Sequence, residues 1–340
     1  MKRTNAFALG IGMTLASPAA LAADAALIEA AKKEGSVTWY TTQIVDQLAR
    51  PAAIAFEKKY GMKVNLTRAD SLQVALRLSN EAKAGKMQAD VYDSTSISLA
   101  MKAQNIPMKW QPDAAKTLPK QFSDPEGYWT AASGNVITIG YNTNLVPKGT
   151  QPKTFADLLD EKWKGRMVWN SQPGQSSGPG FVGTVLSAMG EEKGMDYLRK
   201  LSTQKVTGLQ QAARQVLDQV IAGEYAIGLQ IFNNHAFISA SQGAPSDWQP
   251  LEKSMRYSLV FSVTREAPHP NAGKLFADFM TSKDGQAVFR DADYMTVDPD
   301  VPPKTPELLP DSGTFEAIYF TPEQLESQMP KWTKILKDLF

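Results

Sequence analysis

Short strand-like runs alternate with longer segments of helical periodicity in the first third of the chain. The run SVTWYTT (36–42) is rich in β-branched and aromatic residues, and QLARPAAIAFEKKYG (47–61) repeats its apolar residues at helical spacing. MKVNLTR (62–68) alternates as a strand does, and DSLQVALRLSNEAKAG (70–85) begins with good N-cap residues. ADVYDST and the helical SISLAMKAQN follow. This β-α-β-α order predicts a parallel sheet covered by helices on both faces.

The middle of the chain contains two long extended runs that bracket a second α/β series. These runs are GNVITIGYNTN (134–144) and RYSLVFSVTRE (256–266). We interpret them as two hinge strands, so that the chain enters a second lobe at about residue 136 and returns at about residue 260. The predicted fold is therefore α/β, with two doubly wound lobes joined by a two-strand hinge. Lobe 1 comprises 24–135 and 260–340, and lobe 2 comprises 136–259.

The first 23 residues have the layout of a secretory signal peptide. Lys2 and Arg3 precede the short apolar run AFALGIGMTLA, and the segment ends in the small residues of SPAALAA. The apolar run is too short for a stable membrane span. We predict cleavage after residue 23, export to the periplasm, and a mature chain without this segment; a retained anchor is the alternative.

Composition narrows the classes of function. The 340 residues are 43% apolar and 21% charged, which is typical of a globular protein. Removing residues 1–23 removes two of the 36 basic residues and none of the 35 acidic ones, so the predicted mature chain has a formal net charge of −1. This balance gives no indication of a nucleic-acid partner. The absence of cysteine excludes thiol nucleophiles, zinc–thiolate sites and iron–sulfur clusters.

Signals for catalysis are weak. The chain contains no P-loop and no H-E-x-x-H, and its two histidines are His235 and His269. His269 lies between two prolines just before a predicted helix, which favours a structural turn. His235 has no acidic residue close to it in sequence. We therefore predict that the protein is not an enzyme and that it uses no cofactor.

Three hydroxyl-rich loops follow predicted strands and precede predicted helices. They are YTTQ (40–43), DSTS (93–96) and the glycine-rich PGQSSGPGF (173–181), which includes Ser176 and Ser177. A helix start offers free N–H groups and partial positive charge, so such loops suit anions. Ordinary helix capping is the alternative for each loop taken singly.

Arg214 is the strongest candidate cation. It stands near the start of the predicted helix in QQAARQVLDQV, where the helix dipole favours acidic residues instead. If it faces a cleft, its planar guanidinium would pair with a carboxylate or phosphate; a surface position is the alternative. Arg68, at the end of the second strand, is a similar candidate.

Seven stretches of the chain resemble the periplasmic solute-binding proteins of ABC importers, in the branch that contains ferric-ion binders and organic-anion relatives. They are WYTTQ, FEKKYGMKV, EAKAGKMQADVYDS, GYNTNLVPK, TFADLLDEKWKGR, VIAGEYAIGL and APHPNAGKLFADFMTSKDGQ. The resemblance covers nearly the whole mature chain. It implies the type II periplasmic-binding fold, two α/β lobes around a hinge that closes on ligand.

The resemblance also implies that this chain lacks the usual iron ligands. Ferric binders of this branch hold iron with two adjacent tyrosines after the strand that AIGLQIF matches, where this chain has Asn233, Asn234 and His235. Ile44 stands near the position of a common histidine ligand. Ser94 and Thr95 stand where an acidic ligand is often found, with Asp93 adjacent. The remaining groups are mostly neutral and suit an oxyanion better than a ferric ion.

These observations predict a receptor for a small organic anion such as a carboxylate, phosphonate or sugar phosphate. Its partners would be a membrane-embedded ABC permease with its ATPase, and we expect a monomer. The alternative is a ferric receptor that uses Tyr40, Asp93 or a bound anion, and a secreted enzyme is a third possibility. No metal ligands are predicted. The candidate ligand-binding residues are Tyr40, Thr41, Thr42, Asp93, Ser94, Thr95, Ser176, Ser177, Arg214, Asn233, Asn234 and His235.

Overall fold

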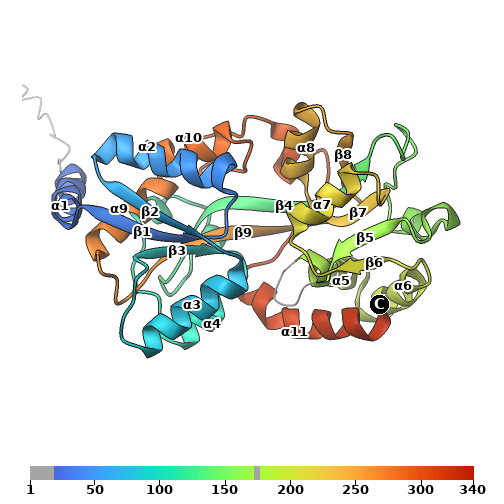
Figure 1. Ribbon diagram of the computed structural model, residues 1–340, viewed down its shortest axis with the longest axis horizontal. Coiled ribbons are helices and arrows are strands. Elements are labelled where there is room, and N and C mark those ends of the chain that lie inside the picture. The colour runs from blue at the N-terminus through green and yellow to red at the C-terminus, as the bar shows by residue number, and fades with distance from the viewer. Residues whose placement is uncertain (1–18, 172–176) are drawn as a thin grey trace, which may run out of the picture.

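The computed structural model describes residues 19–171 and 177–340, and their strands form one mixed sheet (Figure 1). The strand order is β2-β1-β3-β9-β4-β7-β5-β6, with β10 beside β9 and β8 beside β4. The strands are β1 (Ser36–Thr41), β2 (Lys63–Arg68), β3 (Val91–Ser94), β4 (Thr130–Asn142), β5 (Met167–Asn170), β6 (Thr207–Leu209), β7 (Ile227–Phe232), β8 (Ser246–Gln249), β9 (Ser254–Val263) and β10 (Ala317–Tyr319).

Helices cover both faces of the sheet along the long axis of the molecule, as Figure 1 shows. A five-residue π-helical turn precedes α2, and short 3₁₀ turns occur in the connections. The helices are α1 (Ala19–Glu34), α2 (Arg50–Tyr60), α3 (Ser71–Lys83), α4 (Ser98–Ala103), α5 (Ser177–Met189), α6 (Glu191–Ser202), α7 (Ala213–Ile221), α8 (Asn233–Ser241), α9 (Pro270–Thr281), α10 (Lys283–Asp291) and α11 (Pro322–Leu339).

Two long antiparallel strands, β4 and β9, run through the middle of the molecule and belong to both of its ends. The parallel group β2-β1-β3 joins the carboxyl-terminal part of β9, where Asp93 pairs with Phe261. The parallel group β7-β5-β6 joins the carboxyl-terminal part of β4, where Ile137 pairs with Phe232. We call the part around β1–β3, α9 and α10 the first half, and the part around β5–β7 the second half. The predicted mixture of α/β units and two extended connecting runs is confirmed.

The sheet differs from the prediction in one respect. Each parallel group is completed by antiparallel pairing to β4 or β9, so the strands of both halves join into one mixed sheet. The reason is that β4 and β9 are long, with 13 and 10 residues, and so each reaches the hydrogen-bonding edges of both halves.

Each half has its own apolar core. In the first half the rings of Trp39 and Phe56 pack on Phe276, with centroids 5.0 Å and 5.1 Å away. In the second half Trp169 packs on Phe181 at 6.0 Å. Burying each such side chain contributes about 1.5–3 kcal/mol, so the two cores hold the sheet ends rigid.

The C-terminal helix α11 packs on the second half. Its residues Leu325, Trp332 and Leu336 are buried in the same apolar cluster as Trp169. The sequence placed residues 260–340 in lobe 1, and this helix therefore crosses to the other half after the chain returns along β9. The bounds of the two lobes stay a prediction.

The predicted signal peptide lies mostly outside the described residues, and α1 begins at Ala19. Among the helices of the described ranges, none has the length and apolar character that crossing a membrane requires.

Candidate functional site

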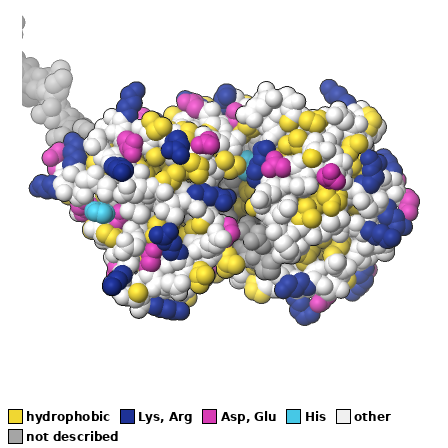
Figure 2. Space-filling view, viewed as in Figure 1, with side chains coloured by type: hydrophobic (Ala, Val, Ile, Leu, Met, Phe, Trp, Pro, Cys, Tyr) yellow, Lys and Arg dark blue, Asp and Glu magenta, His cyan; other side chains and the backbone are white. Residues whose placement is uncertain are grey.

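A cavity of about 120 Å³ lies where the two halves meet, at the ends of their parallel strands. Figure 2 shows the hollow between the halves, with basic side chains on both of its sides. Parallel strands present their carboxyl ends, and the starts of the following helices, at one edge of a sheet. The cavity is lined by Thr42, Gln43, Ile44, Arg68, Asp70, Ser71, Thr95, Asn135, Ala212, Ala213, Arg214, Phe232, His235, Tyr257 and Tyr294.

Two arginines reach this cavity from opposite halves. Arg68 is the last residue of β2 and has no ion-pair partner within the described residues. Arg214 lies in the first turn of α7, where its Nε and Nη2 donate to Oδ1 of Asp218 at 3.1 Å and 2.9 Å. Its Nη1 donates to the Ser239 hydroxyl at 2.9 Å, so the guanidinium is held in place.

One carboxylate is among the residues that line the cavity. Asp70 is the N-cap of α3, and its Oδ1 accepts the backbone N–H of Gln73 at 2.9 Å. This bond partly satisfies the carboxylate at the positive end of the helix. Of the three charged residues that line the cavity, two are therefore basic and one is acidic, and Arg214 is also paired with Asp218.

His235 contributes a neutral imidazole. Its side chain is buried, and Nε2 lies 3.3 Å from the hydroxyl oxygen of Tyr294. Burial, aided by the positive charge of Arg214, lowers the pKa of His235 to about 3. The ring is therefore uncharged at neutral pH. Its Nδ1 atom is buried and has no hydrogen-bond partner within the described residues.

Four of the predicted site residues line the cavity, namely Thr42, Thr95, Arg214 and His235, and the weaker candidate Arg68 joins them. Asp93 holds Thr42 in place, because the N–H and the hydroxyl of Thr42 both donate to Oδ1 of Asp93, at 2.9 Å and 2.6 Å. The strand-to-helix loops after β1 and β3 thus reach the site as expected.

Asp93 and Tyr40 lie behind the cavity wall. Asp93 is fully buried and also accepts the indole N–H of Trp39 at 2.8 Å, and burial raises the pKa of its carboxyl. The Tyr40 hydroxyl donates to Oε1 of Glu81 at 2.7 Å on the side of β1 that faces α3. Burial and the Glu81 carboxylate raise the pKa of Tyr40 well above its usual range. Neither residue is among those that line the cavity.

Thr41 and Ser94 are also buried away from the cavity lining, and their side chains shape their own loops. The Thr41 hydroxyl accepts the N–H of Gln43 at 3.0 Å, and the Ser94 hydroxyl accepts the N–H of Ser96 at 3.1 Å. Ser176 lies outside the described residues. Ser177 is the first residue of α5, and its side chain lies outside the described part.

Asn233 and Asn234 differ in position from the strand-end loop that the sequence indicated. The helix α8 begins at Asn233, directly after β7. Successive residues of a helix point about 100° apart, so three neighbours do not share one face. Asn233 instead donates to the backbone oxygen of Leu308 at 2.7 Å and accepts the N–H of Asn234 at 2.8 Å. Of these three residues, His235 is the one that lines the cavity.

Sequence reasoning missed the residues that the central strands bring to the cavity. Asn135 of β4 and Tyr257 of β9 are paired in register and line it together. Tyr294 comes from the segment after α10. The long extended runs were recognised as connections, but a strand's alternation does not show which of its side chains faces a ligand.

Clustered metal ligands are absent from the described residues. No group of three or more histidine, aspartate or glutamate side chains there lies close enough to hold a metal ion. The polar groups that line the cavity are hydroxyls, side-chain amides, two guanidinium groups, one imidazole and one carboxylate. With a single carboxylate among them, they suit an oxyanion better than a hard cation.

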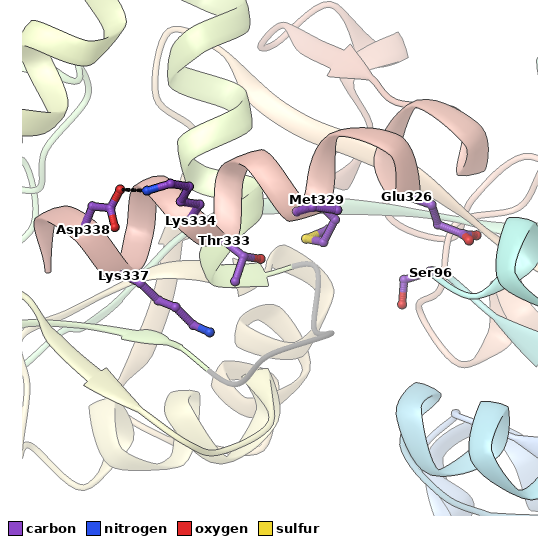
Figure 3. A pocket seen from close by; sticks show the side chains of 8 residues that line it. Ser96, Glu326, Met329, Thr333, Lys334, Lys337 and Asp338 are labelled. Carbon is purple, nitrogen blue, oxygen red and sulfur yellow. Dashed lines mark hydrogen bonds and ion pairs between the residues drawn. The ribbon is translucent and has the colours of Figure 1, made fainter.

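A second and larger hollow, of about 540 Å³, lies beside α11 (Figure 3). Met329, Thr333 and Lys337 line it from the helix, and Ser96 and Glu326 lie at one end. Both carboxylate oxygens of Glu326 accept the N–H of Leu99, at 3.0 Å and 2.8 Å. Because Leu99 belongs to α4, this bond ties α11 to the first half. Burial raises the pKa of Glu326 to about 7.

The chain matches a known protein family and is similar to proteins of known name. A family model described as bacterial extracellular solute-binding protein matches residues 89–313. The Fe(3+)-binding periplasmic protein of Serratia marcescens is 24% identical over 295 residues, which cover 80% of this chain and 82% of that protein. The resemblance deduced from the sequence is confirmed.

Two solved structures have the same fold. The periplasmic binding protein AfuA of Actinobacillus pleuropneumoniae, with fructose-6-phosphate bound, superposes with a TM-score of 0.76 at 20% identity, covering 90% of this chain and 98% of AfuA. Iron-bound HitA of Pseudomonas aeruginosa has a TM-score of 0.69 at 20% identity, covering 89% of this chain and 99% of HitA. The predicted periplasmic-binding-protein fold is thereby confirmed.

Proposed function

Because the chain belongs to the family of bacterial extracellular solute-binding proteins, we propose that it is the periplasmic receptor of an ABC importer for a small organic anion. The solute binds between the two halves and is released to a membrane-embedded permease driven by its ATPase. Residues 1–23 act as a cleaved signal peptide. The receptor works as a monomer and binds its solute without changing it.

The observation that carries this proposal is the pair of arginines that line one cavity from opposite halves, Arg68 from β2 and Arg214 from α7. Like charges that face each other across a cavity repel, and an anion between them turns this repulsion into attraction. Such an anion would also stabilise a closed arrangement of the two halves. The Thr42 and Thr95 side chains add polar contacts around it.

Two basic residues line the cavity, and its volume is small, so both the charge and the size of the anion are limited. The cavity volume of about 120 Å³ suits a molecule of a few carbon atoms with one or two acidic groups. Carboxylates, phosphonates and small sugar phosphates fall within this class. Neutral His235 and the hydroxyl groups supply hydrogen bonds that orient such a solute.

A ferric receptor is the second candidate, and the name of the Serratia marcescens relative supports it. Iron(III) prefers anionic oxygen ligands, and the proposed ligands Tyr40 and Asp93 are both engaged in hydrogen bonds outside the cavity lining. Iron binding would therefore depend on an accompanying anion held by Arg68 and Arg214.

Titration calorimetry, preceded by a thermal-shift screen, tests the proposal. The screen contains small carboxylates, phosphonates, sugar phosphates and ferric citrate, and the mature protein starts from residue 24. We expect stoichiometric binding of at least one organic anion that needs no metal. Binding of ferric ion alone, or of no anion in the screen, would contradict the anion proposal.

A further inference from the structure

We propose that the solute carries a neutral hydroxyl group close to its anionic group, and that Nδ1 of His235 accepts a hydrogen bond from this hydroxyl. This inference rests on the proposed function and narrows its ligand class. Hydroxycarboxylates and phosphorylated polyols have the required chemistry. Anions without a hydroxyl group do not.

The starting observation is an unsatisfied polar atom in a residue that lines the cavity. His235 is 7% exposed, lines the cavity, and has no partner for Nδ1 within the described residues. Buried polar atoms in proteins almost always have a hydrogen-bond partner, and exceptions call for a functional reason. A ligand group in the adjoining cavity would supply the missing partner.

The hydrogen bonds around Nε2, the other ring nitrogen of His235, determine whether the missing partner of Nδ1 is a donor or an acceptor. The Tyr294 hydroxyl donates to Oε1 of Gln47 at 3.5 Å. Because a hydroxyl group has a single proton, its oxygen then accepts from Nε2 of His235, 3.3 Å away. A neutral imidazole with its proton on Nε2 has a lone pair on Nδ1. The missing partner is therefore a donor.

The positive charge of Arg214 determines which kind of donor is favoured, an ammonium group or a hydroxyl group. An ammonium group of a ligand would lie close to the Arg214 guanidinium, whose positive charge already acts on His235. Like charges at such a distance repel. A hydroxyl group donates without this repulsion. The anionic part of the same ligand remains free to pair with Arg214 or Arg68.

Two matched pairs of probes test the preference, one for each kind of anion. L-malate is compared with succinate, and glycerol 3-phosphate with propyl phosphate, by titration calorimetry on the mature protein. The members of each pair share their acidic groups and differ in hydroxyl groups. We expect at least one hydroxylated probe to bind about tenfold more tightly than its partner, as for one buried hydrogen bond.

Two variants of His235 test the assigned atom. In the His235→Asn variant, the amide oxygen of the new side chain takes the place of Nδ1. In the His235→Gln variant, the longer side chain places its amide near the position of Nε2, so that no atom takes the place of Nδ1. We expect His235→Asn to keep the ratio of affinities between the two members of a pair and His235→Gln to lose it. Thermal melting of both variants checks that they fold.

The outcomes separate this inference from the proposed function. Equal binding within both pairs by the wild-type protein overturns the inference and leaves an anion receptor. A preference that survives in His235→Gln assigns the hydroxyl to another residue and also overturns it. If no anion in the screen binds, both the anion function and the inference fail. If an anion other than these four binds, the same comparison is made between its hydroxylated and its deoxy form.

Discussion

The Tyr40 hydroxyl donates a hydrogen bond of 2.7 Å to Oε1 of Glu81, on the face of β1 that packs against α3. The guanidinium of Arg77 lies 4.4 Å from the centre of the same ring. Tyr40 is therefore part of the packing of the first half. Because burial and Glu81 raise the pKa of its phenol, the phenolate that a ferric ion needs is disfavoured.

We predict that the mature protein stays colourless when mixed with ferric citrate. Tyrosinate ligands to iron(III) would give a band in the visible range. Tyr40 lies outside the cavity lining, and burial raises the pKa of the Tyr294 phenol, which does line it and whose ionisation is therefore disfavoured. Tyr40→Phe should leave solute affinity unchanged and lower the free energy of unfolding by about 1 kcal/mol, because one hydrogen bond is lost. A visible band that disappears in Tyr40→Phe would restore the ferric function.

Arg68 and Arg214 should each be required for anion binding. Replacing either one by glutamine removes a charge that faces the cavity, and we expect affinity for the cognate anion to fall about tenfold or more. Arg199→Gln is a matched control, because Arg199 pairs with Asp196 on the exposed surface of α6. Calorimetry at two salt concentrations should show weaker binding at the higher one. Unchanged affinity in both cavity variants would remove the electrostatic basis of the proposed function.

Ligand should bring the two halves together. The antiparallel pair β4 and β9 connects them, and domain closure about such hinges is a common response to ligand. Small-angle scattering with saturating solute should give a smaller radius of gyration than the free protein. Arg68→Gln, which removes one side of the attraction, should show less closure at equal occupancy. An unchanged radius at full occupancy would indicate a rigid receptor.

The stability of the protein should depend on the protonation of Glu326. Its pKa is raised from 4.5 to about 7, so the folded state favours the protonated carboxyl more than the unfolded state does. This stabilisation is complete below pH 4.5 and is lost as the pH rises through 7. The nearby carboxylate of Glu323 acts in the same direction.

Urea unfolding of Glu326→Gln measures this effect. Relative to the variant, the wild-type protein should lose on the order of 2–3 kcal/mol between pH 4.5 and pH 8. Glu192→Gln, at an exposed position of α6, serves as the control and should follow the wild-type curve. Parallel curves for the wild type and Glu326→Gln would mean that Glu326 titrates normally.

Asn233 should stabilise the fold without contributing to ligand binding. Asn233→Ala removes the bonds to Leu308 and to the N–H of Asn234, both of which are buried. We expect the free energy of unfolding to fall by about 1–3 kcal/mol, with solute affinity unchanged. A large loss of affinity in a variant that melts normally would place Asn233 at the ligand.

The sequence by itself determined the class of fold and the identity of the linking strands. Hydrophobic periodicity is local, so QLARPAAIAFEKKYG and VITIGYN could be recognised as helix and strand without knowledge of their neighbours. It also pointed to Thr42, Thr95 and His235, which follow strands, and to Arg214, which stands near a helix start, and all four line the cavity. The family resemblance rested on several such segments together.

Only the tertiary structure decided which of the polar residues share the cavity. Asp93 and Thr42 are far apart in the chain, and the hydrogen bonds between them turn Asp93 from a candidate ligand into a support for its loop. Asn233 and His235 are two residues apart, yet the start of α8 directs them to different surroundings. Side-chain direction depends on where a helix begins and on what packs against it. Those contacts form between segments that no local pattern connects.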